Sequence, residues 1–145
     1  MTLKEEARAA LDAKGTAEQD LAKAAVCPPW RHAAFGLVMG SLVATPALPL
    51  PLRLLALALI LVGIGLIVRS DRRRMGMFIN GYRRGKTLIV SHLMLGFTLA
   101  LFAISIRASD AGDLVTPLLL GGAAFLVCVI GSVLWQRVFV SELGA

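Results

Sequence analysis

Charged residues are scarce in this chain. Only 17% of its 145 residues are Asp, Glu, Lys or Arg, and 57% are hydrophobic. Soluble domains carry about 25% charged and roughly 45–50% apolar residues. The mean hydropathy is +0.78. A globule of 15.4 kDa has too little interior to hide this much hydrocarbon from water. The composition therefore excludes an ordinary soluble domain and indicates an integral membrane protein.

Cysteine and histidine are also rare. Cys27 precedes the first apolar segment and Cys128 lies inside the last, so the two cysteines do not form a disulfide framework. His32 and His92 have no carboxylate or cysteine neighbour at ligand spacing. We therefore expect no metal site, no cofactor and no redox site.

Catalytic patterns are missing as well. No Ser, Cys or His arrangement supports nucleophilic catalysis, and the carboxylates Asp110 and Asp113 fit turn positions better than an acid–base pair. The stretch GYRRGKT ends like a phosphate-binding loop. However, three residues separate Gly81 from Gly85 where that motif has four, and an apolar segment follows. The sequence predicts neither an enzyme nor a nucleotide-binding protein.

Long apolar runs are what the chain has in their place. They cover residues 33–50, 52–68, 88–106 and 115–135, each close to the roughly 20 residues that cross about 30 Å of hydrocarbon. None contains Lys, Asp or Glu. Arg53 enters the second run by one residue, and we expect its guanidinium to extend to the lipid headgroups. Buried strands are much shorter, about 4–8 residues, so these runs predict transmembrane helices.

The connections pair the four segments into two hairpins. Pro46, Pro49 and Pro51 interrupt the first connection, and residues 107–114 supply turn chemistry in the second. We therefore predict an all-α integral membrane four-helix bundle made of two transmembrane hairpins. It forms a domain over residues 31–145, preceded by a cytoplasmic helical tail over residues 1–30.

The tail is polar, with a thin apolar stripe. Thr2 with Glu5 and Thr16 with Gln19 each fit a helix start, and Gly15 between them fits a helix stop. We expect two short amphipathic helices, about Leu3–Lys14 and Ala17–Val26, that are solvated or lie at the membrane interface.

Basic residues concentrate between the second and third apolar segments, in a loop predicted over residues 69–87. The residues expected to bind anionic lipid headgroups or a partner are Arg72, Arg73, Arg74, Arg83, Arg84 and Lys86. Loops rich in Lys and Arg stay in the cytoplasm, which also places both termini there. Trp30 and Trp135 fall at the same ends of their segments, where indole rings favour the headgroup zone. We expect the bacterial inner membrane, and no nucleic-acid partner, because membrane topology already explains the basic loop.

Small residues recur every fourth position in two segments. In lipid, such faces let helices approach closely. The predicted helix-packing residues are Gly36, Gly40, Ala44, Ala124, Cys128 and Ser132. We expect these faces to mediate contacts within the chain or between protomers. The buried hydroxyls are expected to bond their own helix backbones.

These features favour a structural, accessory or assembly protein that forms a homo-oligomer or a subunit of a larger membrane complex. A small oligomeric transporter or channel is one alternative. Another is a membrane-bound regulator whose basic loop recruits a cytosolic partner.

Overall fold

The computed structural model describes residues 2–75 and 85–142, and the regular structure within them is entirely helical. The elements are α1 (Leu3–Ala25), α2 (Pro29–Ala44), the 3₁₀ turn η1 (Thr45–Ala47), α3 (Leu50–Met75), α4 (Lys86–Asp110) and α5 (Val115–Glu142). The predicted all-α class is confirmed. Of the described helices, α3, α4 and α5 are long and apolar enough to cross a membrane, which supports a multi-pass membrane protein. With 16 residues, α2 is shorter than these.

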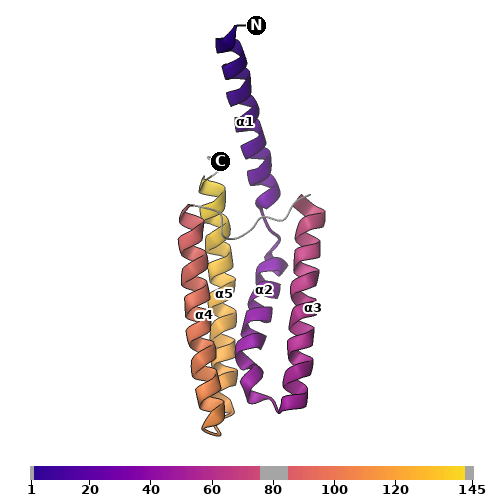
Figure 1. The fold of residues 1–145 in the computed structure, drawn as a ribbon, viewed down its shortest axis with the longest axis vertical. Coiled ribbons are helices and arrows are strands. Elements are labelled where there is room, and N and C mark those ends of the chain that lie inside the picture. Colours follow the sequence, from indigo (N-terminus) through magenta and orange to yellow (C-terminus); the bar gives the residue numbers. More distant parts are fainter. Residues whose placement is uncertain (1, 76–84, 143–145) are drawn as a thin grey trace.

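Helices α2 to α5 run side by side, and α1 extends beyond one end of them (Figure 1). The central helix is α5, which packs against both α2 and α4. In the described part of the chain, α3 contacts α2, η1 and α1 but neither α4 nor α5. The core is therefore a three-helix unit of α2, α4 and α5, with α3 attached through α2.

The buried apolar cluster lies where these three helices meet. Val43 from α2, Leu101 from α4 and Ala124 from α5 form it, and Phe102 and Leu120 pack around it. By contrast, only 6% of the residues in the apolar stretch of α3 are buried. Most of its leucines point outward, as expected of a helix that faces lipid.

Helix α2 ends at Ala44, whereas the sequence prediction placed the end of the first span at residue 50. Pro46 has no N–H to donate to the carbonyl of Leu42, four residues earlier in the chain. The Leu42 carbonyl accepts the backbone N–H of Thr45 and, at 2.8 Å, the Thr45 hydroxyl, and the backbone tightens into η1. At its other end α2 begins at Pro29, whose missing N–H costs nothing in the first turn.

The predicted loop over residues 69–87 is also wrong at its start. Helix α3 continues to Met75, so Arg69, Arg72, Arg73 and Arg74 lie on a helix. Arginine is a good helix former, and the backbone hydrogen bonds do not end where the hydrocarbon does. For the same reason α4 and α5 extend past the apolar runs 88–106 and 115–135.

The two short helices predicted for the tail are one continuous helix, α1. The Thr2–Glu5 start is confirmed, because the Glu5 carboxylate accepts the Thr2 N–H at 2.7 Å. Thr16 begins no second helix. Its hydroxyl donates to the carbonyl of Asp12 one turn earlier, at 3.0 Å, and Gly15 keeps a helical backbone.

Candidate functional site

Glycines bring the backbones of α2 and α5 close together. A Cβ on Gly36 would lie 2.8 Å from the carbonyl oxygen of Phe125. On Gly40 it would lie 2.7 Å from the carbonyl oxygen of Gly121, and on Gly121 it would lie 2.8 Å from Cβ of Ala44. Gly36, Gly40 and Ala44 therefore lie along the face of α2 that meets α5, and the two backbones approach too closely for a side chain at either glycine of α2.

The row predicted on α5 faces the same interior. Ala124, Cys128 and Ser132 are 1%, 0% and 6% exposed. Ala124 joins the apolar cluster, Sγ of Cys128 lies 3.6 Å from Oγ1 of Thr98 on α4, and Oγ of Ser132 lies 2.8 Å from Nδ1 of His32 on α2. The row therefore contacts both neighbouring helices of its own chain.

Buried hydroxyls bond across helices more than the sequence predicted. Ser105, on α4, donates to the carbonyl of Val43 on α2 at 2.6 Å. Ser109, one turn later on the same helix, donates to the carbonyl of Pro46 at 2.6 Å. Their acceptors are available because α2 ends at the proline turn, where late carbonyls have no partner within the helix. The predicted bonds to their own helix backbone are therefore replaced by bonds to a neighbouring helix at Thr98, Ser105 and Ser132.

An ion pair joins α2 to α3 at the end where α1 begins. Nη2 of Arg31 lies 2.7 Å from Oδ2 of Asp71, and Nε of Arg31 lies 3.3 Å from Oδ1 and 3.2 Å from Oδ2. The Asp71 side chain is 4% exposed and that of Arg31 is 23% exposed. Fork-shaped pairing of this kind is the strong geometry for arginine and carboxylate. The one signal for it in the sequence is that Asp71 is the sole carboxylate in an arginine-rich stretch.

Two further contacts lie at this end of helices α2 to α5. The Cys27 N–H, in the linker between α1 and α2, donates to Oε1 of Gln136 on α5 at 3.1 Å. The Trp135 ring stacks on Phe139 with centroids 5.1 Å apart, and its indole nitrogen is buried without a partner in the described chain. The linker is therefore fixed to α5 rather than free.

Helix α4 begins against a carboxylate from α5. The Glu142 side chain accepts the backbone N–H of Lys86, and the Thr87 hydroxyl donates to it at 3.4 Å. Negative charge is favoured at a helix N-terminus. Gly85 has a φ of 141°, a backbone conformation that favours glycine because other side chains are strained there.

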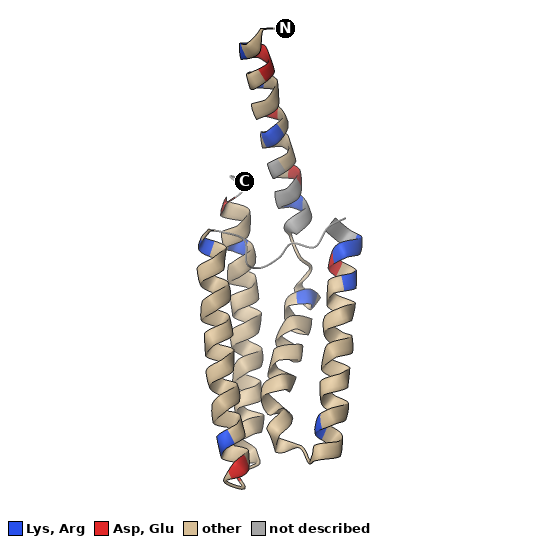
Figure 2. Ribbon diagram, in the orientation of Figure 1, with Lys and Arg blue, Asp and Glu red and all other residues tan. Residues whose placement is uncertain are grey.

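The basic residues predicted to bind lipid or a partner fall into three groups. Arg72, Arg73 and Arg74 lie on the last turns of α3, and Lys86 is the first residue of α4. Arg83 and Arg84 lie outside the described residues. Figure 2 shows that charged residues gather at the two ends of α2 to α5, while the middle of the helices carries none.

Arg53, at the opposite end, binds the turn that precedes its own helix. Its Nη2 donates to the carbonyls of Pro46, at 2.8 Å, and Leu48, at 3.2 Å, and Nε is buried without a partner in the described chain. The guanidinium thus joins the start of α3 to the proline-rich turn.

No protein family, curated protein or solved structure matches this chain. Its function must therefore be inferred from geometry alone. Within residues 2–75 and 85–142, no three His, Cys, Asp or Glu side chains come together as a metal site would require. What the polar residues do is join helices: Arg31 to Asp71, His32 to Ser132, and the Glu142 carboxylate to the start of α4.

Proposed function

We propose that this chain is a small structural or accessory protein of the bacterial inner membrane, folded as a four-helix bundle with two transmembrane hairpins. In this proposal the short helix α2 also crosses the membrane, in addition to α3, α4 and α5. Its 16 residues rise about 24 Å, and the three residues of η1 add about 6 Å. The sum matches a hydrocarbon core of about 30 Å. Supporting this, α2 lies alongside α3 and α5 (Figure 1).

Both termini and the basic end of α3 are assigned to the cytoplasm. Most of the Lys and Arg residues of the chain lie at the end of the bundle that bears α1, and the other end has Arg53 and Arg107. Cytoplasmic loops carry such an excess of basic residues. Anionic lipid headgroups are the proposed partners of this end.

The observation that carries the accessory role is how the interior uses its polar groups. Transport requires polar groups that converge on a water-accessible path near the membrane centre. Here Thr98 bonds Cys128, Ser105 bonds the carbonyl of Val43, and Ser132 bonds His32. The hydroxyls are taken up in separate pairs along helix contacts, which favours a packed accessory protein over a small oligomeric transporter or channel.

Association with a second copy or a larger complex would use outward faces, because Gly36, Gly40 and Gly121 are already occupied within the chain. At Gly96 on α4 and Gly122 on α5, an added Cβ would have no side-chain or distant backbone atom within 4 Å. We propose these faces for helix contacts between proteins.

Extraction into lipid-retaining polymer particles followed by mass spectrometry tests the accessory role. We expect the chain to be recovered bound to itself or to a membrane partner, and Gly96→Leu with Gly122→Leu to weaken that association. Gly65→Leu, at a third open position, is the matched control. Recovery as a lone monomer that conducts a solute in proteoliposomes would overturn the proposal in favour of transport.

Impermeant maleimide labelling tests the four crossings, using variants in which Cys27 and Cys128 are replaced by Ala. We expect Leu50→Cys and Ala111→Cys to react in intact cells, and Thr2→Cys to react only after lysis. If only α3, α4 and α5 cross, Thr2→Cys reacts from outside, and the proposed topology is wrong.

A regulatory role is the second candidate, and α1 is the observation that favours it. The helix extends away from the bundle (Figure 1), and its Leu3 and Leu11 are 87% and 67% exposed. A cytosolic protein that recognises an amphipathic helix would find it accessible. Removing residues 2–25 would abolish such recruitment and leave bundle assembly unchanged.

A further inference from the structure

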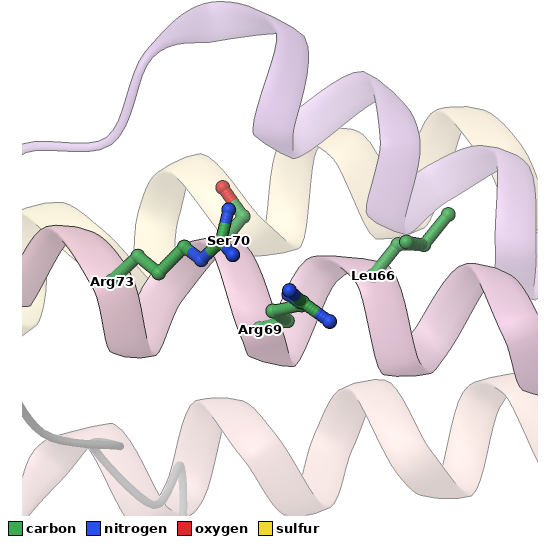
Figure 3. A pocket seen from close by; sticks show the side chains of 4 residues that line it. All are labelled: Leu66, Arg69, Ser70 and Arg73. Atoms are coloured by element: carbon green, nitrogen blue, oxygen red, sulfur yellow. The ribbon is translucent and has the colours of Figure 1, made fainter.

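The last turns of α3 form a basic surface on the side of that helix opposite Asp71. Leu66, Arg69, Ser70 and Arg73 follow the i, i+3, i+4, i+7 pattern of a single helix face. They line an open pocket of about 400 Å³ (Figure 3). The Arg73 side chain lies along the helix toward Ser70, and Arg69 and Leu66 follow on the same face.

The charge of this pocket is not balanced by the nearby carboxylate. Asp71 is held by Arg31 and is 4% exposed. Among the described residues, neither Arg69 nor Arg73 has a carboxylate partner. A second open pocket, of about 390 Å³, shares both arginines and adds Gly65, Val68 and Arg72. Arg69 and Arg73 therefore lie between two hollows that favour an anion, and guanidinium matches phosphate in particular.

An apolar path leads from the pocket toward the membrane centre. Leu66, Val62, Leu59 and Leu55 share the pocket's helix face and are 61%, 58%, 62% and 57% exposed. From Leu55 to Leu66 the helix rises about 16 Å, close to half of a hydrocarbon core of about 30 Å. A phosphate joined to a hydrocarbon chain fits this combination, whereas a soluble phosphate leaves the path unused.

We propose that this face of α3 binds one anionic phospholipid. Arg69 and Arg73 hold its phosphate, Ser70 donates a hydroxyl hydrogen bond to it, and an acyl chain lies along Leu66, Val62, Leu59 and Leu55. The inference deepens the proposed contact with anionic lipid and rests on the proposed crossing of α3. It adds Arg69 and Ser70, which the sequence prediction omitted, and moves the site from a loop to a helix.

Native mass spectrometry of the purified full chain in detergent tests the site. The delipidated protein is titrated with dioleoyl phosphatidylglycerol, with dioleoyl phosphatidylcholine, and with soluble glycerol 3-phosphate. We expect one tightly bound phosphatidylglycerol and weaker binding of phosphatidylcholine. Arg69→Gln with Arg73→Gln should weaken the first by about 25-fold, since each basic residue near an anionic headgroup contributes on the order of a five-fold change in affinity.

The matched control is Arg8→Gln with Arg137→Gln, which removes the same charge from the same end of the protein away from the pocket. We expect it to change binding by less than about two-fold, because neither residue lines the pocket. Arg69→Lys with Arg73→Lys keeps the charge but not the fork geometry, and should give an intermediate loss. Thermal unfolding of each variant checks that the fold is retained.

Equal losses in the pocket and control variants would overturn the site in favour of diffuse charge attraction. Glycerol 3-phosphate that displaces the lipid at equal concentration would assign the pocket to a soluble phosphate. Binding by purified protein does not depend on which side of the membrane the pocket faces. A failed topology experiment with intact lipid binding would therefore refute the proposed function and not the pocket.

Discussion

Single residues decide how closely these helices approach. The contact of α2 with α5 exists because Gly36, Gly40 and Gly121 place backbone against backbone, with no space for a Cβ. Dispersion contacts and interhelical hydrogen bonds hold helices together in lipid, since lipid tails are as apolar as the helices. A single methyl group at such a position would therefore push the two helices apart.

Gly40→Ala should destabilise the bundle by about 1–3 kcal/mol, the usual cost of adding a group to a packed interface. The added Cβ would lie 2.7 Å from the Gly121 carbonyl oxygen, a clash that only a backbone shift can relieve. Gly96→Ala has open space around it and should have little effect. Unfolding midpoints in mixed micelles measure the difference. Equal midpoints for the two variants would show that this contact does not support the fold.

The Arg31–Asp71 pair makes a second prediction at this scale. Asp71→Asn leaves a guanidinium that is mostly buried without its counterion, and we expect a loss of about 2 kcal/mol. The exposed pair of Lys23 with Asp20, at 3.9 Å, provides the control, because Asp20→Asn removes a solvated contact worth less than about 1 kcal/mol. A double-mutant cycle with Arg31→Gln measures the coupling, and a coupling near zero contradicts the role assigned to the pair.

At the scale of elements, helix ends carry most of the polar chemistry. The Asp113 carboxylate caps α5 by accepting the backbone N–H groups of Val115, at 2.9 Å, and Thr116, at 3.1 Å. Its pKa is lowered from the ordinary 3.8, first by the hydrogen bond from the Thr116 hydroxyl and then by the two backbone N–H groups. The Asp110–Asp113 turn thus serves the start of a helix.

A lowered pKa fixes the sign of the pH dependence at this cap. The ionised carboxylate stabilises the start of α5 above the ordinary pKa, and this contribution is lost as pH falls through the lower, folded value. NMR titration of the Asp113 carboxyl carbon should therefore give a midpoint below 3.8. Thr116→Val should raise the midpoint. A titration at or above the ordinary value would show that the cap does not form.

The sequence predicted the elements well where one signal acted alone. Apolar runs located the cores of the long helices, and Thr2 with Glu5 located the start of α1. It failed where tertiary partners decided the outcome. No local pattern reveals that Ser105 bonds the carbonyl of Val43, or that Asp71 is bound by Arg31 forty residues away.

At the scale of the whole molecule, attachment is uneven. Helices α2, α4 and α5 share a buried core. Helix α3 contacts α2 and the turn η1, and it is joined to them by the Arg53 hydrogen bond to Pro46 and the Asp71 ion pair with Arg31. Much of the surface of α3 is therefore left for lipid, which agrees with the phospholipid proposed there.

Uneven attachment predicts an order of separation under denaturing detergent. Spin labels on Leu59 of α3 and Leu119 of α5 should move apart at lower denaturant than labels on Leu95 of α4 and Leu119. All three positions have exposed side chains, so the labels themselves should not disturb the packing. Pulsed EPR distances measure both transitions. A single shared transition would show that α3 is as firmly integrated as the core helices.

The glycine contact of α2 also has a consequence for biosynthesis. Gly40 is made 85 residues before Phe125, the α5 residue that it meets. At ribosomal speeds of about 5–20 residues per second, this interval is roughly 4–17 s. During that time the glycine face of α2 lacks the helix that later covers it, so a membrane insertase or chaperone that shields small-residue helices would act in this interval.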